Sequence, residues 1–299
     1  MRIVGIDENG LGPRLGPLIA TAASIEVQGY DAKRLRSLGR EIGIADSKQT
    51  SGFGHMSRAE SLTLAIAESA ASTPITTADD LLEVLGLDTP KTLRSVCPGG
   101  PTESQCWGET IPLPAFGGSL EKGRKMLAEL AQGGVKVSRV RTVIACADMV
   151  NTSLAAGHSK VHLDLLLFER LILDARKNSP SDLTAICGMV GGIRKYPGYF
   201  RLLNNPKSTA EPCVYSVPKV GEVRFEIKAD DRHLPVGLSS MVGKVVRELG
   251  MRRIVRFYQS HDSSLADVSG YHDRVTAKFV ESSAKLRRSL KIVPGCFER

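Results

Sequence analysis

The chain has 299 residues, 42% of them apolar, and carries a formal net charge of +8. This length and composition allow a full hydrophobic core and exclude a disordered protein. No apolar run approaches the roughly 20 residues of a membrane span, and the first residues do not have the pattern of a signal peptide. We therefore expect a cytoplasmic protein without membrane partners. The basic charge favours polyanionic partners such as nucleic acid.

Apolar runs and helical periodicity alternate along the chain, which predicts an α/β or mixed architecture. Strands are expected over residues 2–7, 18–27, 135–146, 183–190 and 223–227. Helices are expected over residues 57–72, 159–177 and 238–249, where apolar positions recur every three or four residues. We interpret residues 1–299 as a single domain, with residues 238–299 as its helical C-terminal part.

Residues 88–119 differ from the rest of the chain. They are rich in Pro, Gly, Thr and Ser, and they contain Trp107, the single tryptophan. A long segment of this kind within one domain is often functional or mobile. We interpret it as an inserted, lid-like loop.

The six cysteines are scattered, with no Cys-x-x-Cys pair and no histidine pair at metal spacing. This pattern argues against a zinc site, and a disulfide framework is not expected in a chain of this size. We expect free thiols. They are Cys97, Cys106, Cys146, Cys187, Cys213 and Cys296.

Asp7 and Glu8 are adjacent carboxylates at the end of the first predicted strand, and Gly10 and Gly12 form the turn after them. Neighbouring acids repel each other, and placing them at the end of a central strand costs desolvation free energy. A divalent cation commonly offsets this cost. The alternative for this segment alone is a strand that ends in a solvated acidic turn.

The motifs that accompany these acids resemble those of the ribonuclease HII family in the same order, from residue 3 to about residue 276. The family opens with Asp-Glu-Ala-Gly-Arg-Gly-Pro followed by Leu-Gly-Pro, and later has Asp-Ser-Lys, an Asp before a helix of small residues, and a Gly-Tyr element. The matching segments are Asp7-Glu8-Asn9-Gly10-Leu11-Gly12-Pro13, Leu15-Gly16-Pro17, Asp46-Ser47-Lys48, Asp230 with Ser239-Ser240-Met241-Val242-Gly243-Lys244, and Gly270-Tyr271.

The resemblance implies a ribonuclease H-like fold, a mixed central sheet flanked by helices. It implies an endonuclease that hydrolyses the RNA strand of RNA–DNA hybrids, or ribonucleotides embedded in duplex DNA, by a two-metal mechanism with Mg²⁺ or Mn²⁺. Asp7, Glu8 and Asp230 correspond to its catalytic metal ligands. Asp231 is one residue out of register and is interpreted as a surface neighbour. A monomer is expected.

The resemblance also implies substrate contacts. Gly10 and Gly12 let the backbone approach the ribonucleotide, Leu11 lies between them, and Tyr271 corresponds to a tyrosine that packs on a sugar. Tyr271 has the alternative of an ordinary core or surface residue. Two lysines could contact phosphates, although a helix-surface position is an alternative for the second. They are Lys48 and Lys244.

Two departures from the family pattern weaken this assignment. Leu11 replaces an arginine, and Arg14 is the nearest residue that could substitute for it. Gly188 stands where the family has a further Asp, and the nearby Asp164 and Glu169 fall on the preceding predicted helix. Losing a carboxylate weakens a metal site without necessarily abolishing catalysis. The alternatives are therefore a hybrid-binding protein with impaired catalysis, and a basic α/β protein that neither binds nor cleaves hybrids.

Overall fold

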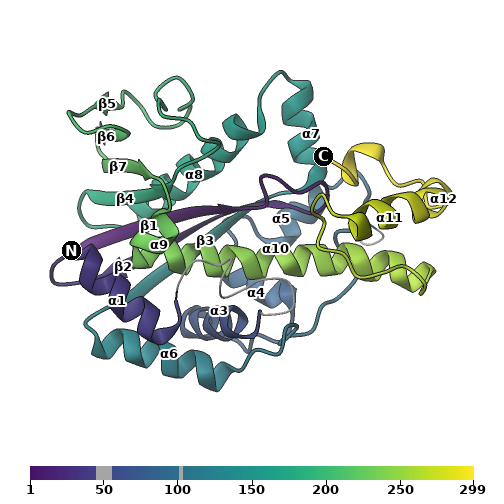
Figure 1. The fold of residues 1–299 in the computed structure, drawn as a ribbon, viewed down its shortest axis with the longest axis horizontal. Coiled ribbons are helices and arrows are strands. Elements are labelled where there is room, and N and C mark those ends of the chain that lie inside the picture. Colours follow the sequence, from purple (N-terminus) through teal and green to yellow (C-terminus); the bar gives the residue numbers. More distant parts are fainter. Residues whose placement is uncertain (45–55, 101–103) are drawn as a thin grey trace.

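The structure is a computed structural model, and it describes residues 1–44, 56–100 and 104–299. Its described residues form a seven-stranded sheet in the order β3-β2-β1-β4-β7-β6-β5 (Figure 1). Strands β1, β4 and β7 are parallel to one another, and β2 is antiparallel to both its neighbours β1 and β3. The strands are β1 (Arg2–Asn9), β2 (Leu18–Glu26), β3 (Lys136–Ala145), β4 (Leu183–Gly188), β5 (Lys207–Ser208), β6 (Val214–Val217) and β7 (Gly221–Glu226).

Helices cover both faces of the sheet (Figure 1). One face packs against α1 (Ala32–Ile42), α3 (Ser57–Ala70), α4 (Ala78–Leu85), α6 (Leu120–Gln132) and α10 (Leu234–His261). The other face packs against α7 (Ala147–Ala155) and α8 (Lys160–Lys177). The remaining helices are α5 (Pro90–Ser95), α9 (Ala229–Arg232), α11 (Arg274–Ser282), α12 (Ala284–Ser289) and the short 3₁₀ helix η1 (Pro294–Cys296). The expected mixed sheet flanked by helices is confirmed.

The helix predicted over residues 238–249 is much longer, because α10 spans 28 residues. It begins at Leu234 with Pro235 in its first turn, a position where proline costs no hydrogen bond. Its second half packs in a separate cluster with Leu15 and Phe279, so apolar residues lie on several sides of the helix. A helix that is buried on several sides has no single apolar stripe, so its ends cannot be located from the periodicity of apolar residues.

Strand β1 is buried on both faces, and its side chains alternate between the two cores. Ile3 belongs to the core on the α10 side, and Val4 and Ile6 belong to the core on the α8 side. Gly5 faces α10, where an added Cβ atom would lie 2.2 Å from the backbone nitrogen of Val236. The strand and the first turn of α10 therefore touch at the backbone, which holds the C-terminal end of β1 beside α9 and α10.

The segment over residues 88–119 contains α5, and several of its described residues are tied to α10. Trp107 lies between two guanidinium groups, with Arg94 Cζ 5.2 Å and Arg253 Cζ 5.0 Å from its ring centroid. Tyr258 donates a hydrogen bond of 2.7 Å to Gln105. These contacts hold the Trp107 region against the body of the fold. Within the described residues, no helix combines the length and apolar character needed to cross a membrane.

Candidate active site

The C-terminal ends of the parallel strands β1, β4 and β7 meet at one edge of the sheet. Asp7 lies on β1 one residue beyond the Ile6–Cys187 pairing with β4, so Gly188 is its lateral neighbour. A Cβ atom added to Gly188 would lie 2.6 Å from Asp7 Oδ1 and 3.8 Å from Glu8 Oε2. The Asp7 carboxylate therefore fills the space in which a side chain at position 188 would begin.

Asp230 reaches the same region from α9, the short helix after β7. Lys228 before it adopts a left-handed backbone conformation with φ of 54°, which turns the chain sharply from the strand into the helix. The neighbouring Asp231 is directed elsewhere, because it forms ion pairs with Arg36 at 2.6 Å and Arg40 at 2.7 Å on α1. The structure thus places Asp231 at the α1 surface, as the sequence register suggested.

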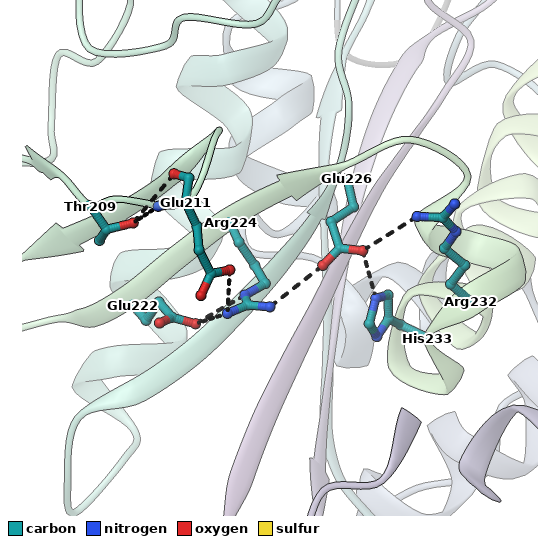
Figure 2. A network of polar contacts seen from close by, with 7 residues as sticks. All are labelled: Thr209, Glu211, Glu222, Arg224, Glu226, Arg232 and His233. Atoms are coloured by element: carbon teal, nitrogen blue, oxygen red, sulfur yellow. Dashed lines mark hydrogen bonds and ion pairs between the residues drawn. The ribbon is translucent and has the colours of Figure 1, made fainter. Parts of the chain in front are cut away.

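A polar network fixes the turn that carries Asp230 (Figure 2). Glu226, the last residue of β7, lies 2.9 Å from His233 Nε2 and 3.6 Å from Arg224 Nη1. The other ring nitrogen of His233 lies 2.7 Å from the Tyr30 hydroxyl. Because Glu226 and His233 bracket α9, these contacts hold both ends of the turn.

Replacing Glu226 with Gln is expected to lower the free energy of unfolding by about 1 kcal/mol. The hydrogen bond from His233 lowers the pKa of Glu226, so its stabilising contribution exists above the ordinary carboxyl pKa of 4.5. The contribution disappears as the pH falls through the lowered pKa. Denaturant unfolding of wild type and Glu226→Gln between pH 3 and pH 7 measures this, and a pH-independent difference would contradict it.

The Asp7 carboxyl lies in a strongly acidic environment. Burial raises its pKa well above the ordinary value, and the nearby Glu8 and Asp230 raise it further. A hydrogen bond from the Ser240 side chain on α10 opposes the rise. Three carboxylates from two different elements therefore act on one another here, as the resemblance implied for Asp7, Glu8 and Asp230.

Asp164 on α8 is a fourth carboxylate near this site. It is fully buried, and neither of its oxygens has a hydrogen-bond partner in the described structure. Burial raises its pKa well above the ordinary value, and the neighbouring Asp7 raises it further. The beginning of α8 lies against the loop after β4, where a Cβ atom on Gly191 would meet Val161 at 2.7 Å.

Glu169, the other acid on α8 considered from the sequence, has a structural role. Its carboxylate accepts hydrogen bonds from the backbone N–H groups of Arg201, Leu202 and Leu203 at 2.9 to 3.0 Å. A carboxylate satisfied in this way caps the loop after β4. Of the two buried acids on this helix, only Asp164 is therefore available to the site.

The donor set at this edge suits a hard divalent cation, because it consists of carboxylate oxygens. The Asp164 oxygens have no hydrogen-bond partner among the described residues, and the pKa of Asp7 is raised. Both observations indicate buried carboxyl groups whose negative charge the described residues do not compensate. As the side chains stand, however, no group of three or more His, Cys, Asp or Glu residues in the described ranges is arranged to hold a metal ion. A cation would have to draw these carboxylates together.

The glycine turn after β1 is surrounded by arginines that the sequence pattern did not single out. Gly10, with φ of +98°, accepts a hydrogen bond from the Arg299 guanidinium. The Nε atom of the buried Arg247 lies 3.4 Å from the Cβ position of Gly10. Among the described residues, some N–H groups of both arginines are buried without hydrogen-bond partners: Arg247 Nε, Arg299 Nε and Arg299 Nη1. Two guanidinium groups therefore lie against this turn, and that of Arg247 is paired with Glu248.

The other residues of this turn occupy different environments. Leu11 is half-buried and packs against the α8 core, whereas Gly12 faces open space and accepts a hydrogen bond from His272 Nε2 at 3.1 Å. Arg14 pairs with Glu298 at 2.6 Å. Arg14 is thus directed to Glu298 and is not placed as a substitute for the family arginine. Arg247 and Arg299 are the arginines that contact this turn.

Tyr271 lies beside two cations. Lys244 Nζ is 5.5 Å and Arg247 Cζ is 4.7 Å from its ring centroid, and the tyrosine is 41% exposed. Glu248 pairs with Lys244 at 2.9 Å and also with Arg247. An exposed ring beside a cation can stack on a sugar or a base while Lys244 contacts phosphate, whereas the side chain of Arg247 is fully buried. The other expected basic contact, Lys48, lies outside the described residues together with Asp46 and Ser47.

Comparison with known proteins identifies the fold. No family model and no curated protein matches the sequence. Among solved structures, ribonuclease HII from Archaeoglobus fulgidus in its complex with PCNA is 15% identical with a TM-score of 0.50, covering 99% of this chain and 93% of that one. Bst-RNase HIII in complex with Mn²⁺ is 12% identical with a TM-score of 0.50, covering all of this chain and 66% of that one.

The fold is therefore ribonuclease H-like, as the sequence motifs implied, and its solved relatives are ribonucleases HII and HIII. At this level of identity the likeness concerns the fold. The activity depends on the residues of the site itself.

Proposed function

We propose that this protein is a metal-dependent endonuclease that hydrolyses the RNA strand of RNA–DNA hybrids or ribonucleotides embedded in duplex DNA. The observation that carries the proposal is the mutual placement of Asp7, Glu8 and Asp230 at the end of β1 in a ribonuclease H-like fold. A structural role alone does not account for placing several repelling carboxylates at a strand end. We further expect a cytoplasmic monomer.

The three carboxylates would hold Mg²⁺ or Mn²⁺, which when bound supplies Lewis-acid stabilisation of the attacking water and of the leaving oxygen. Mn²⁺ accompanies one of the solved relatives. Within the chain, Ser240 orients Asp7 through its hydrogen bond, and the Glu226–His233 contact positions Asp230. These supporting contacts keep Asp7 and Asp230 near the positions from which a bound cation would draw them together.

Asp164 is the residue we propose to compensate for Gly188. The strand position that carries a carboxylate in the family is a glycine, and Asp7 fills its space. A carboxylate from the opposite side of the sheet edge, buried and without hydrogen bonds, restores the total of four acids. Its ionised form would be stabilised by a cation bound beside Asp7, since none of the described residues donates a hydrogen bond to it.

Substrate binding is proposed to use the surface formed by Gly10, Gly12, Lys244 and Tyr271. Glycine backbone at the turn allows close approach of a nucleotide, and Lys244 beside Tyr271 suits the phosphates that flank it. Lys48 is proposed as a further phosphate contact. Leu11 is proposed to hold the turn through its packing on the α8 core.

Replacing Tyr271 with Ala is expected to weaken the binding of a ribonucleotide-containing duplex by roughly 1–3 kcal/mol, the range for loss of one stacking contact. Tyr271→Phe keeps the ring and should recover most of the affinity. Fluorescence anisotropy with a labelled duplex in Ca²⁺ measures both variants. Equal affinities for wild type and Tyr271→Ala would remove Tyr271 from the proposed binding surface.

The test of the proposed activity is cleavage of a duplex with a single embedded ribonucleotide, with Mg²⁺ or Mn²⁺, compared with an all-DNA duplex of the same sequence. Cleavage confined to the ribonucleotide-containing strand is expected. The second candidate is a binding protein with impaired catalysis, which Gly188 favours. Tight, salt-dependent binding that is insensitive to metal, without cleavage, would select this candidate instead.

A further inference from the structure

Four of the six cysteines line a single cavity of about 40 Å³, although they come from four separate segments of the chain. All six cysteines are free thiols, as expected, but they are not scattered in space. We call these four residues the four-cysteine cluster. They are Cys97 after α5, Cys106 beside Trp107, Cys146 before α7, and Cys296 in η1.

The scaffold around the four-cysteine cluster holds its members in place. Cys146 is the N-cap residue of α7, so the backbone of the first helical turn fixes its position. The side chain of Gln105, next to Cys106, donates a hydrogen bond to the carbonyl of Cys296. At least three of the four sulfurs are thus carried by elements whose backbone is fixed by specific contacts.

The lining of the cavity is largely apolar. Leu93, Val96, Ile144 and Trp107 contribute apolar side chains. The thiol of Cys106 interacts electrostatically with those of Cys97, Cys146 and Cys296, so the four side chains lie close together.

We propose that the four-cysteine cluster binds an iron–sulfur cluster through its four sulfur atoms. Four cysteinyl sulfurs are the ligand set of such clusters. Cys97 is followed by Pro98, as is the last cysteine of the bacterial ferredoxin run. The guanidinium of Arg253 also acts on Cys106 and offsets negative charge there.

A single zinc ion fits the geometry less well. Zinc–sulfur bonds of about 2.3 Å require four sulfurs to converge on one point. No three Cys, His, Asp or Glu residues in the described ranges are arranged to hold one ion, yet the cysteines surround a cavity with room for several water molecules. The carboxylate of Asp148 lines the same cavity, but the donor set is otherwise sulfur, which selects thiophilic metals.

The experiment is metal analysis of the full-length protein, expressed with added iron and cysteine and purified without oxygen. Iron and inorganic sulfide in equal amounts are expected, with the visible absorption of an iron–sulfur cluster that is lost on reduction. Serine substitution at each of the four positions should lower the iron content, whereas Cys213→Ser, outside the cavity, should leave it unchanged. The wild-type metal content decides the question even if a serine variant fails to fold.

Other outcomes overturn the proposal. Stoichiometric zinc without sulfide would replace it with a mononuclear site. If no metal is bound after anaerobic reconstitution with iron and sulfide, the four-cysteine cluster is a group of packed thiols that binds no metal. Disulfides found by mass spectrometry of the native protein would assign the cysteines to covalent cross-links. Loss of iron in Cys213→Ser to the same extent as in Cys97→Ser would show that the iron is bound nonspecifically.

Discussion

Asp7→Asn is expected to reduce the rate of cleavage at an embedded ribonucleotide by at least about 10²–10³-fold, the range seen when a group that stabilises developing charge is removed. Asp7 is the carboxyl that both Glu8 and Asp230 act upon, and Ser240 holds it in place. An amide has nearly the same shape but carries no negative charge, so it is a much weaker ligand for a divalent cation than the carboxylate. Single-turnover cleavage with saturating enzyme measures the effect.

The same substitution should stabilise the metal-free protein. Because burial and neighbouring acids raise the pKa of Asp7, its folded form holds a proton that the unfolded form releases above pH 3.8. The free energy of unfolding of wild type therefore falls as the pH rises, because Asp7 must lose its proton in the buried site. Asn has no proton to lose, so the denaturation midpoint of Asp7→Asn at pH 8 should exceed that of wild type. If Asp7→Asn cleaves at the wild-type rate and has the wild-type denaturation midpoint, Asp7 takes no part in the reaction.

Motifs in the sequence singled out three carboxylates that the structure brings together, because the ribonuclease H-like fold places short segments at one sheet edge. Asp7 and Glu8 could be placed from their strand, and Asp230 from its position before the small-residue helix. Asp231 could be set aside because it was out of register, and its ion pairs with Arg36 and Arg40 show where it is directed.

Residues that reach the site from distant segments could not be located in this way. Arg299 contacts Gly10 across nearly the whole chain, and no local pattern links them. Arg247 and Arg253 are both buried, although arginine is usually found at the surface. Their positions follow from tertiary packing of α10, whose burial on several sides leaves no amphipathic signal.

The four-cysteine cluster shows the same limit most clearly. Metal-site patterns in a sequence depend on closely spaced ligand pairs, and these cysteines have none. They come together only because α7, η1 and the segment over residues 88–119 pack at one end of the fold. Spacing along the chain therefore excluded a local metal site and gave no information about a site assembled from distant segments.

Asp164→Asn is expected to lower cleavage and Mn²⁺ affinity by about 10–100-fold, the usual cost of losing a group that supports a metal site. It should also raise the free energy of unfolding of the metal-free protein at neutral pH, because an amide carries no charge and avoids the cost of ionising a fully buried carboxyl. Burial raises the pKa of Asp164, so wild type loses stability relative to the variant as the pH rises above 3.8.

Glu169→Gln is the matched control, because Glu169 is a fully buried acid on the same helix whose oxygens accept three backbone hydrogen bonds. Its substitution should reduce stability and leave Mn²⁺ affinity unchanged. Mn²⁺ binding followed by electron paramagnetic resonance, together with urea unfolding, separates the two residues. A stabilised Asp164→Asn protein with unaltered Mn²⁺ affinity would show that Asp164 is only a strained core residue.

Combining Asp164→Asn with Gly188→Asp tests whether the two positions are interchangeable. The new side chain would begin 2.6 Å from Asp7 Oδ1, so Asp7 must rotate to admit it. The contact is with the end of a side chain and not with backbone, which makes this adjustment feasible. If Asp164 supplies the carboxylate that the strand lacks, the double variant should recover Mn²⁺ affinity relative to Asp164→Asn alone. If Gly188→Asp is folded and stable but the double variant does not recover Mn²⁺ affinity, the carboxylates at positions 164 and 188 do not occupy the same position in the site.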